Sequence, residues 1–224
     1  MFKIAWLIVK KDLLIEYRSK VLVAQVLPLV GTIILLFGFA LGPDNSVLAP
    51  ATPGLIWITI VLSAMLSVIR EVSIESELGG DGMKLFGIEP SSFFLGKTFV
   101  ASVVVFAMAL VTFISGAIVF NSGFSGVLNI IVALIGALLA IFALCSAGIL
   151  FGFIANTTAV RETLMPLLYI PVAFPVVLSA VKVTAPALGG GRGSILEWLG
   201  VLFVLCLAYV SVGTVVSETL LEES

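Results

Sequence analysis

The sequence predicts an all-α membrane protein with six transmembrane helices, an N-terminal amphipathic interfacial helix and a charged cytoplasmic segment between spans two and three. Of its 224 residues, 61% are apolar and only 11% are charged, whereas a soluble domain carries about 25% charge. The mean hydropathy of +1.29 excludes a soluble globular fold, and the many aliphatic residues exclude disorder. Residues 98–160 hold no charge at all. Because about 20 apolar residues cross a bilayer, this run is long enough for two crossings.

The first 20 residues predict a helix that lies on the membrane surface. Apolar residues recur at helical spacing on one face, while lysines and an arginine fall on another. The apolar set is Phe2, Ala5, Trp6, Val9 and Leu13. A plain topology anchor is the alternative interpretation of this segment.

Six spans follow within one membrane domain that covers residues 1–224. They are expected at about 21–41, 54–69, 98–120, 126–155, 161–185 and 195–217. Gly42-Pro43-Asp44 ends the first span, and Asn121-Ser122-Gly123 is the expected turn between the third and the fourth.

Lysine and arginine predict the orientation, because cytoplasmic loops are enriched in them. Nine of these residues lie in the N-terminal segment, the loop after span two and the loop after span four. The opposite side has only Lys182 and Arg192. Both termini are therefore expected in the cytoplasm, for a multi-pass protein of a bacterial-type inner membrane.

Residues 70–97 are the most informative segment, because they hold eight of the 24 charges. A helix over residues 70–78 is expected to stop at Gly79-Gly80. A short apolar knob follows before the proline, and charges beside such a knob are typical of a protein docking site. The candidate docking residues are Arg70, Glu71, Glu75, Glu77, Leu85, Phe86 and Pro90. A solvated loop is the alternative.

Lys97 is the last residue of this segment. Together with its neighbours, in Gly96-Lys97-Thr98, it resembles the end of a phosphate-binding loop. That loop needs a glycine five residues before Gly96, where the chain has Ser91. We therefore expect no ATP binding by this chain alone. Lys97 is expected to mark the cytoplasmic end of span three and to extend toward the interface.

The fifth predicted span carries three prolines. Pro166, Pro171 and Pro175, with Tyr169 among them, predict a helix break that could line a substrate route. A purely structural kink is the equal alternative.

Two pairs of glycines recur at four-residue spacing, Gly38/Gly42 and Gly148/Gly152. They predict close helix packing, with packing inside one chain favoured over packing between copies.

The remaining composition excludes several classes of function. The chain has no histidine, and its two cysteines lie in apolar runs, so no metal site, catalytic triad or disulfide framework is expected. A net charge of −2 does not favour nucleic-acid binding. The predicted spans other than the fifth place no carboxylate or lysine deep in the membrane, which disfavours an ion-coupled transporter.

Several stretches together resemble the CcmB family of haem exporter permeases, within the ABC-2 type. They are Lys11–Lys20, then Phe39–Asp44 with Leu48-Ala49-Pro50 and Pro53–Trp57, and finally Ala155-Asn156-Thr157 with Arg161-Glu162, Met165–Leu168, Pro171 and Pro175. The resemblance covers essentially the whole chain. It depends on the order and spacing of these stretches rather than on one motif.

The resemblance implies a non-catalytic permease subunit of an ABC complex for cytochrome c maturation. Implied partners are a CcmA-like ATPase, CcmC-like and CcmD-like haem-handling membrane proteins, a CcmE-like haem chaperone, membrane lipid and a possible second copy of the chain. Haem is then cargo or is held by a partner, and the chain binds no cofactor of its own. The alternative is an ABC-2 exporter for a polysaccharide, a lipid or a drug.

Overall fold

The computed structural model describes residues 9–14, 21–42, 45–77, 89–120, 126–156, 161–188 and 194–222. All regular structure in these residues is helical. A short helix covers residues 9–14. The others are α2 (Val21–Leu41), α3 (Asn45–Glu77), α5 (Pro90–Val119), α6 (Val127–Asn156), α7 (Arg161–Thr184), the 3-10 turn η1 (Ala185–Leu188) and α8 (Ile195–Glu222).

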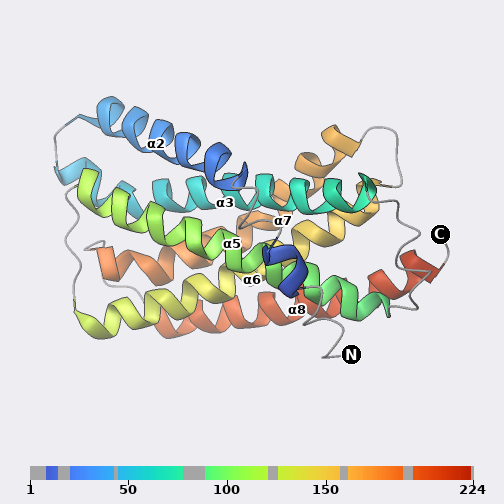
Figure 1. The fold of residues 1–224 in the computed structure, drawn as a ribbon. Coiled ribbons are helices and arrows are strands. Elements are labelled where there is room, and N and C mark those ends of the chain that lie inside the picture. Colours follow the sequence, from blue (N-terminus) through green and yellow to red (C-terminus); the bar gives the residue numbers. More distant parts are fainter. Residues whose placement is uncertain are drawn as a thin grey trace.

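Five long helices run side by side and alternate in direction (Figure 1). α6 is the central helix, because it packs against α3, α5, α7 and α8. The last residues of α3, α6 and α8 and the first residues of α5 and α7 lie at the same end of the bundle, on the right of Figure 1. α2 lies at the edge, where it packs against α3 and α5. The short helix 9–14 lies beside α5 in the right half of the view.

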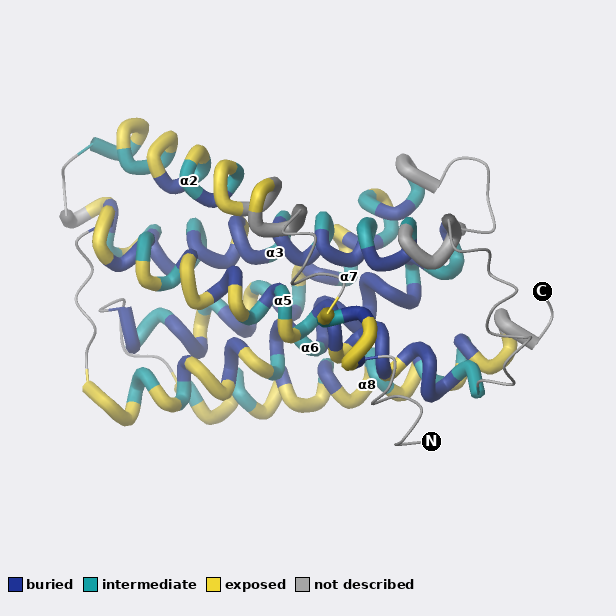
Figure 2. Tube along the Cα trace, in the orientation of Figure 1, coloured by how far each residue is buried: buried dark blue, intermediate teal, exposed yellow. Residues whose placement is uncertain are grey.

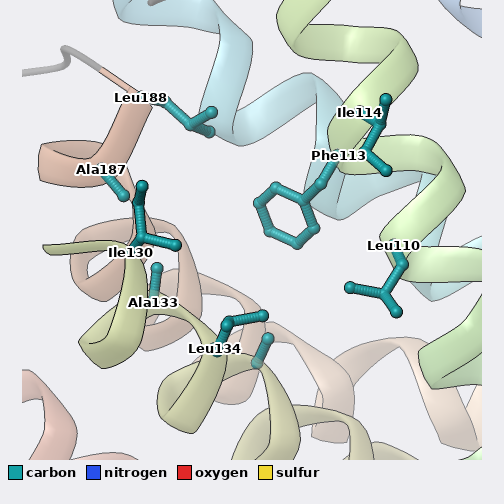
Figure 3. Close-up of a pocket in the computed structure, with 9 residues that line it drawn as sticks. Leu110, Phe113, Ile114, Ile130, Ala133, Leu134, Ala187 and Leu188 are labelled. Atoms are coloured by element: carbon teal, nitrogen blue, oxygen red, sulfur yellow. The ribbon is translucent and has the colours of Figure 1, made fainter. Parts of the chain in front are cut away.

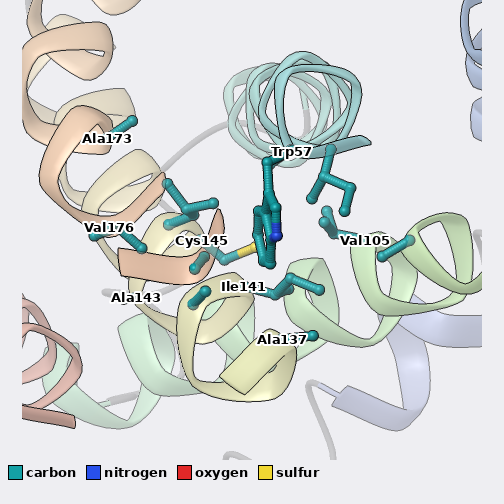
Figure 4. Close-up of a cluster of buried hydrophobic side chains, with 14 of the residues drawn as sticks. Trp57, Val105, Ala137, Ile141, Ala143, Cys145, Ala173 and Val176 are labelled. Carbon is teal, nitrogen blue, oxygen red and sulfur yellow. The ribbon is translucent and has the colours of Figure 1, made fainter. Parts of the chain in front are cut away.

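The core is built around Trp57 of α3, whose indole points between α5, α6 and α7 (Figure 4). Its side chain is fully buried against small and branched residues such as Val105, Ile141 and Cys145. The indole Nε1–H donates a hydrogen bond of 2.9 Å to Thr184 Oγ1. A buried indole needs such a partner, because an unpaired N–H is costly.

Glycines bring α6 against α3, as one of the two glycine pairs predicts. A methyl placed on Gly148 would lie 2.9 Å from Val68, and one on Gly152 would lie 2.5 Å from Val72. Close packing of this pair inside one chain is therefore confirmed. Gly42 differs from this pattern. It follows α2 with a φ of +71° and has no atom near its Cβ position, so it ends a helix rather than packing one.

Among the described residues, five helices are long and apolar enough to cross a membrane, by length and composition. Exposed residues are most frequent along α8 (Figure 2), and many exposed residues of these helices are large and apolar. Exposed apolar side chains in this number suit contact with lipid. In α2 the apolar stretch found is only Leu27–Leu41, so a sixth crossing stays a prediction.

Two helices are longer than the expected spans. α3 starts at Asn45 rather than near residue 54, and its end at Glu77 agrees with the helix expected over residues 70–78. Pro50 and Pro53 lie inside its first turns without ending it. α5 starts at Pro90 rather than near residue 98, because proline suits the first position of a helix. Both ends of the expected 70–97 loop are therefore helical.

Candidate functional site

Three charged side chains from distant parts of the sequence meet near the end of the bundle where α3 finishes. Lys97 of α5 places its Nζ 2.8 Å from Oδ2 of Asp12, in the short helix 9–14. The same ammonium lies 3.4 Å from Oε2 of Glu71 in α3 and donates a hydrogen bond to it. We call Asp12, Glu71 and Lys97 the charged cluster.

The charged cluster is buried. Lys97 is 2% exposed, Glu71 is 3% exposed and Asp12 is 5% exposed. Removing ions from water costs several kcal/mol each, and close pairing of opposite charges is what offsets that cost. Loss of one partner from such a cluster typically costs about 3–5 kcal/mol.

Aromatic rings cover one side of the lysine. The Lys97 ammonium lies 5.7 Å from the centre of the Phe93 ring, which is within reach of a cation–π contact. Phe93 stacks on Phe153 of α6 with ring centres 5.9 Å apart. The cluster therefore connects helix 9–14 with α3 and α5, and through the stacked rings with α6.

The local sequence explains these positions. Val9 and Asp12 lie three residues apart, so they share one face of helix 9–14, and both are buried. Lys10 and Lys11 are exposed on the other side. Because α5 begins at Pro90, Lys97 lies about 10 Å inside that helix at a rise of 1.5 Å per residue.

The expectation that Lys97 extends to the interface is therefore wrong, since its ammonium is held inside the protein. The predicted spans at about 54–69 and 98–120 leave out Glu71 and Lys97, so the expectation that no carboxylate or lysine lies deep in these spans does not cover the two residues. The candidate spans in the structure cover Val47–Ser73 and Pro90–Val119, which include Glu71 and Lys97. The signal that could have revealed this was Pro90, read as the first residue of a helix.

Of the predicted docking residues, the structure describes the side chains of Arg70, Glu71 and Pro90. Glu71 is turned to Lys97, while Arg70 and Pro90 are half-buried. Glu75 and Glu77 belong to the last turns of α3, but their side chains lie outside the described residues. Leu85 and Phe86 lie outside the described residues altogether. Docking at this segment stays a prediction.

The proline-rich helix is continuous. Pro166, Pro171 and Pro175 all lie inside α7, which runs unbroken from Arg161 to Thr184. Tyr169 is fully buried, and its hydroxyl has no hydrogen-bond partner among the described residues. Its ring lies 3.3 Å from the Cβ position of Gly148. The prolines therefore do not end the helix, and a substrate route along it stays a prediction.

A small cavity of about 180 Å³ opens between α5, α6 and η1 (Figure 3). Its walls are apolar side chains, among them Phe113, Leu134 and Leu188. Pockets for drug-sized ligands are typically about 300–1,000 Å³ and include a few polar groups. This cavity therefore does not suit a large polar or charged cargo. Within the described ranges, no group of three or more possible metal ligands occurs.

Comparison with known proteins agrees with the helical membrane architecture. A search of curated proteins finds no match to the chain. A family model described as CcmB protein matches residues 3–223, which is nearly the whole chain. The chain therefore belongs to the CcmB family, the multi-pass membrane permease component of an ABC-type haem export system in cytochrome c biogenesis.

Proposed function

We propose that the chain couples ATP hydrolysis on a separate CcmA-like subunit to haem export or to release of the haem-loaded chaperone. Both termini lie in the cytoplasm in this proposal, and the membrane is the bacterial inner membrane. The Lys/Arg count supports this orientation, because nine of the eleven lysines and arginines lie in the N-terminal segment and in the loops after spans two and four.

One observation carries the coupling role. α3 runs from Asn45 to Glu77 as one helix, and α5 begins at Pro90. The segment expected to touch the ATPase is therefore joined directly to two helices that also build the core around Trp57. A displacement at this segment reaches the core along helices of 33 and 30 residues, without a flexible linker inside either one.

The experiment is a set of substitutions in the docking segment of the complete complex. Glu75→Lys and Phe86→Ala should weaken co-purification of the ATPase subunit and lower the yield of mature cytochrome c in cells. A buried aromatic anchor at a protein interface typically contributes about 2 kcal/mol or more. Glu197→Lys is the matched control, because Glu197 is an exposed carboxylate at the opposite end of the bundle. Normal association and yield for changes throughout residues 75–90 would overturn the proposed contact.

Haem enters this proposal as cargo rather than as a cofactor of the chain. The sequence has no histidine, so an axial ligand would have to be a methionine, a cysteine or a tyrosine. Two of these residues, Cys145 and Tyr169, are fully buried in the packed core. A purified, partner-free sample should therefore lack a stoichiometric six-coordinate haem spectrum. Family membership favours haem over a polysaccharide, lipid or drug as the transported compound.

A further inference from the structure

We propose that Lys97 is a positioning residue for coupling. Its ammonium forms a clasp that holds helix 9–14, called the N-terminal helix below, through Asp12 and holds α3 through Glu71. The coupling part of this proposal rests on the proposed function. The clasp itself rests on geometry alone: one buried ammonium is shared between carboxylates of two other segments.

The clasp joins parts of the chain that the sequence separates widely. Asp12 and Lys97 are 85 residues apart in the sequence, and Glu71 and Lys97 are 26 residues apart. The shorter ion pair, at 2.8 Å, is the one that holds the N-terminal helix. Because this pair is buried, the helix cannot move away from α5 without exposing or separating two charges.

The clasp lies between the proposed ATPase contact and the core. Glu71 is about 9 Å before the end of α3, and Lys97 is about 10 Å after the start of α5, at 1.5 Å per residue. Motion delivered to the end of α3 or to the N-terminal helix would therefore reach both elements together. This is the arrangement expected of a joint that makes separate segments move as one body.

Asp12 also has a second partner at the surface. Its Oδ1 lies 3.6 Å from Nζ of Lys11, whose side chain is 56% exposed. When the N-terminal helix moves outward, the Asp12 carboxylate can remain paired with Lys11 while it leaves Lys97. Lys11 belongs to the same helix as Asp12, so in this proposal the two residues stay together when helix 9–14 moves away from Lys97.

Asp12→Asn is the decisive variant, because it removes one charge, keeps the side-chain shape and leaves the Lys97–Glu71 pair in place. It is compared in the complete complex with Asp12→Glu, which keeps the charge, and with Glu197→Gln, an exposed carboxylate at the other end. Three quantities are measured: hydrogen exchange of residues 9–14, ATPase rate and yield of mature cytochrome c.

We expect Asp12→Asn to raise exchange in residues 9–14 and to lower cytochrome yield, each by about tenfold, which lies within the range of typical coupling between sites. Cytochrome yield and ATPase rate are compared at equal amounts of protein in the membrane, because loss of one partner from the charged cluster also destabilises the fold. The ATPase rate per complex should stay close to that of the wild type. Asp12→Glu should recover at least part of the yield, and Glu197→Gln should match the wild type.

Unchanged exchange in Asp12→Asn would overturn the clasp. Faster exchange with normal cytochrome yield would overturn its role in coupling while leaving the contact established. An equal loss of cytochrome yield in Asp12→Glu and Asp12→Asn would overturn the claim that the charge of Asp12 is required. Cytochrome maturation that continues in the wild-type complex without ATP hydrolysis would instead defeat the proposed function, and the exchange result would still decide the clasp.

Discussion

The two halves of α3 are held to the rest of the bundle by different chemistry. In its first half, Trp57 donates a neutral hydrogen bond to Thr184 of α7 and meets Phe113 of α5 edge to face, with ring centres 6.3 Å apart. In its second half, Glu71 pairs with Lys97 inside the charged cluster. The two residues of α3 are about 21 Å apart along the helix.

In the proposal above, the contact of Trp57 with Thr184 stays fixed, whereas the contacts of the charged cluster change. A neutral hydrogen bond surrounded by packed apolar side chains has one good arrangement, because the core around it is close-packed. A buried ion pair depends strongly on its partners and is often no more stabilising than a hydrophobic replacement would be. This difference fits the proposal that the charged cluster moves during coupling, because a buried ion pair is weak evidence for stability alone.

The largest expected effect tests the charged half. Lys97→Met removes the ammonium that both Asp12 and Glu71 face, so the free energy of unfolding should fall by about 3–5 kcal/mol. Thermal unfolding in detergent and the amount of protein in the membrane measure this loss. Lys182→Met is the control, because Lys182 is an exposed lysine in α7. Equal stability of the two variants would show that the charged cluster does not hold the helices.

A smaller effect tests the close packing beside that half. Gly152→Ala would bring a methyl within 2.5 Å of Val72, one residue after Glu71, so α3 and α6 must shift apart. Overpacking of this kind costs about 2 kcal/mol. Gly54→Ala in α3 is the matched control, since no atom lies near its Cβ position and alanine favours a helix. A lower melting temperature is expected for Gly152→Ala only, and the same change in both would contradict the close approach.

The smallest effect tests the neutral half. Thr184→Val leaves the buried indole N–H of Trp57 without its acceptor and should cost about 1 kcal/mol. Cytochrome maturation should remain near normal once protein amounts are equalised, because no charge moves there. Thr219→Val, an exposed threonine that also donates to its own helix, provides the baseline. Loss of maturation in Thr184→Val at normal protein levels would remove the distinction between the two halves.

Much of the candidate site was out of reach of sequence reasoning for one identifiable reason. Sequence reasoning ends span two just before Arg70 and Glu71, and it starts span three just after Lys97. In isolation that placement is sound, because a charge in lipid is costly. Inside a bundle the cost is offset by a partner on another helix, and no local pattern reports that Asp12 and Glu71 both face Lys97.

The sequence by itself determined the class of protein, since long apolar runs without charge leave helices across a membrane as the available solution. It also determined the Gly148/Gly152 contact surface and the family, which follow from spacing and order along the chain. Only the tertiary structure decided where α3 ends, where α5 begins and which charges meet. Those outcomes depend on interactions between residues up to 85 positions apart in the sequence, and the stability of a buried charge is set by such partners rather than by its neighbours along the chain.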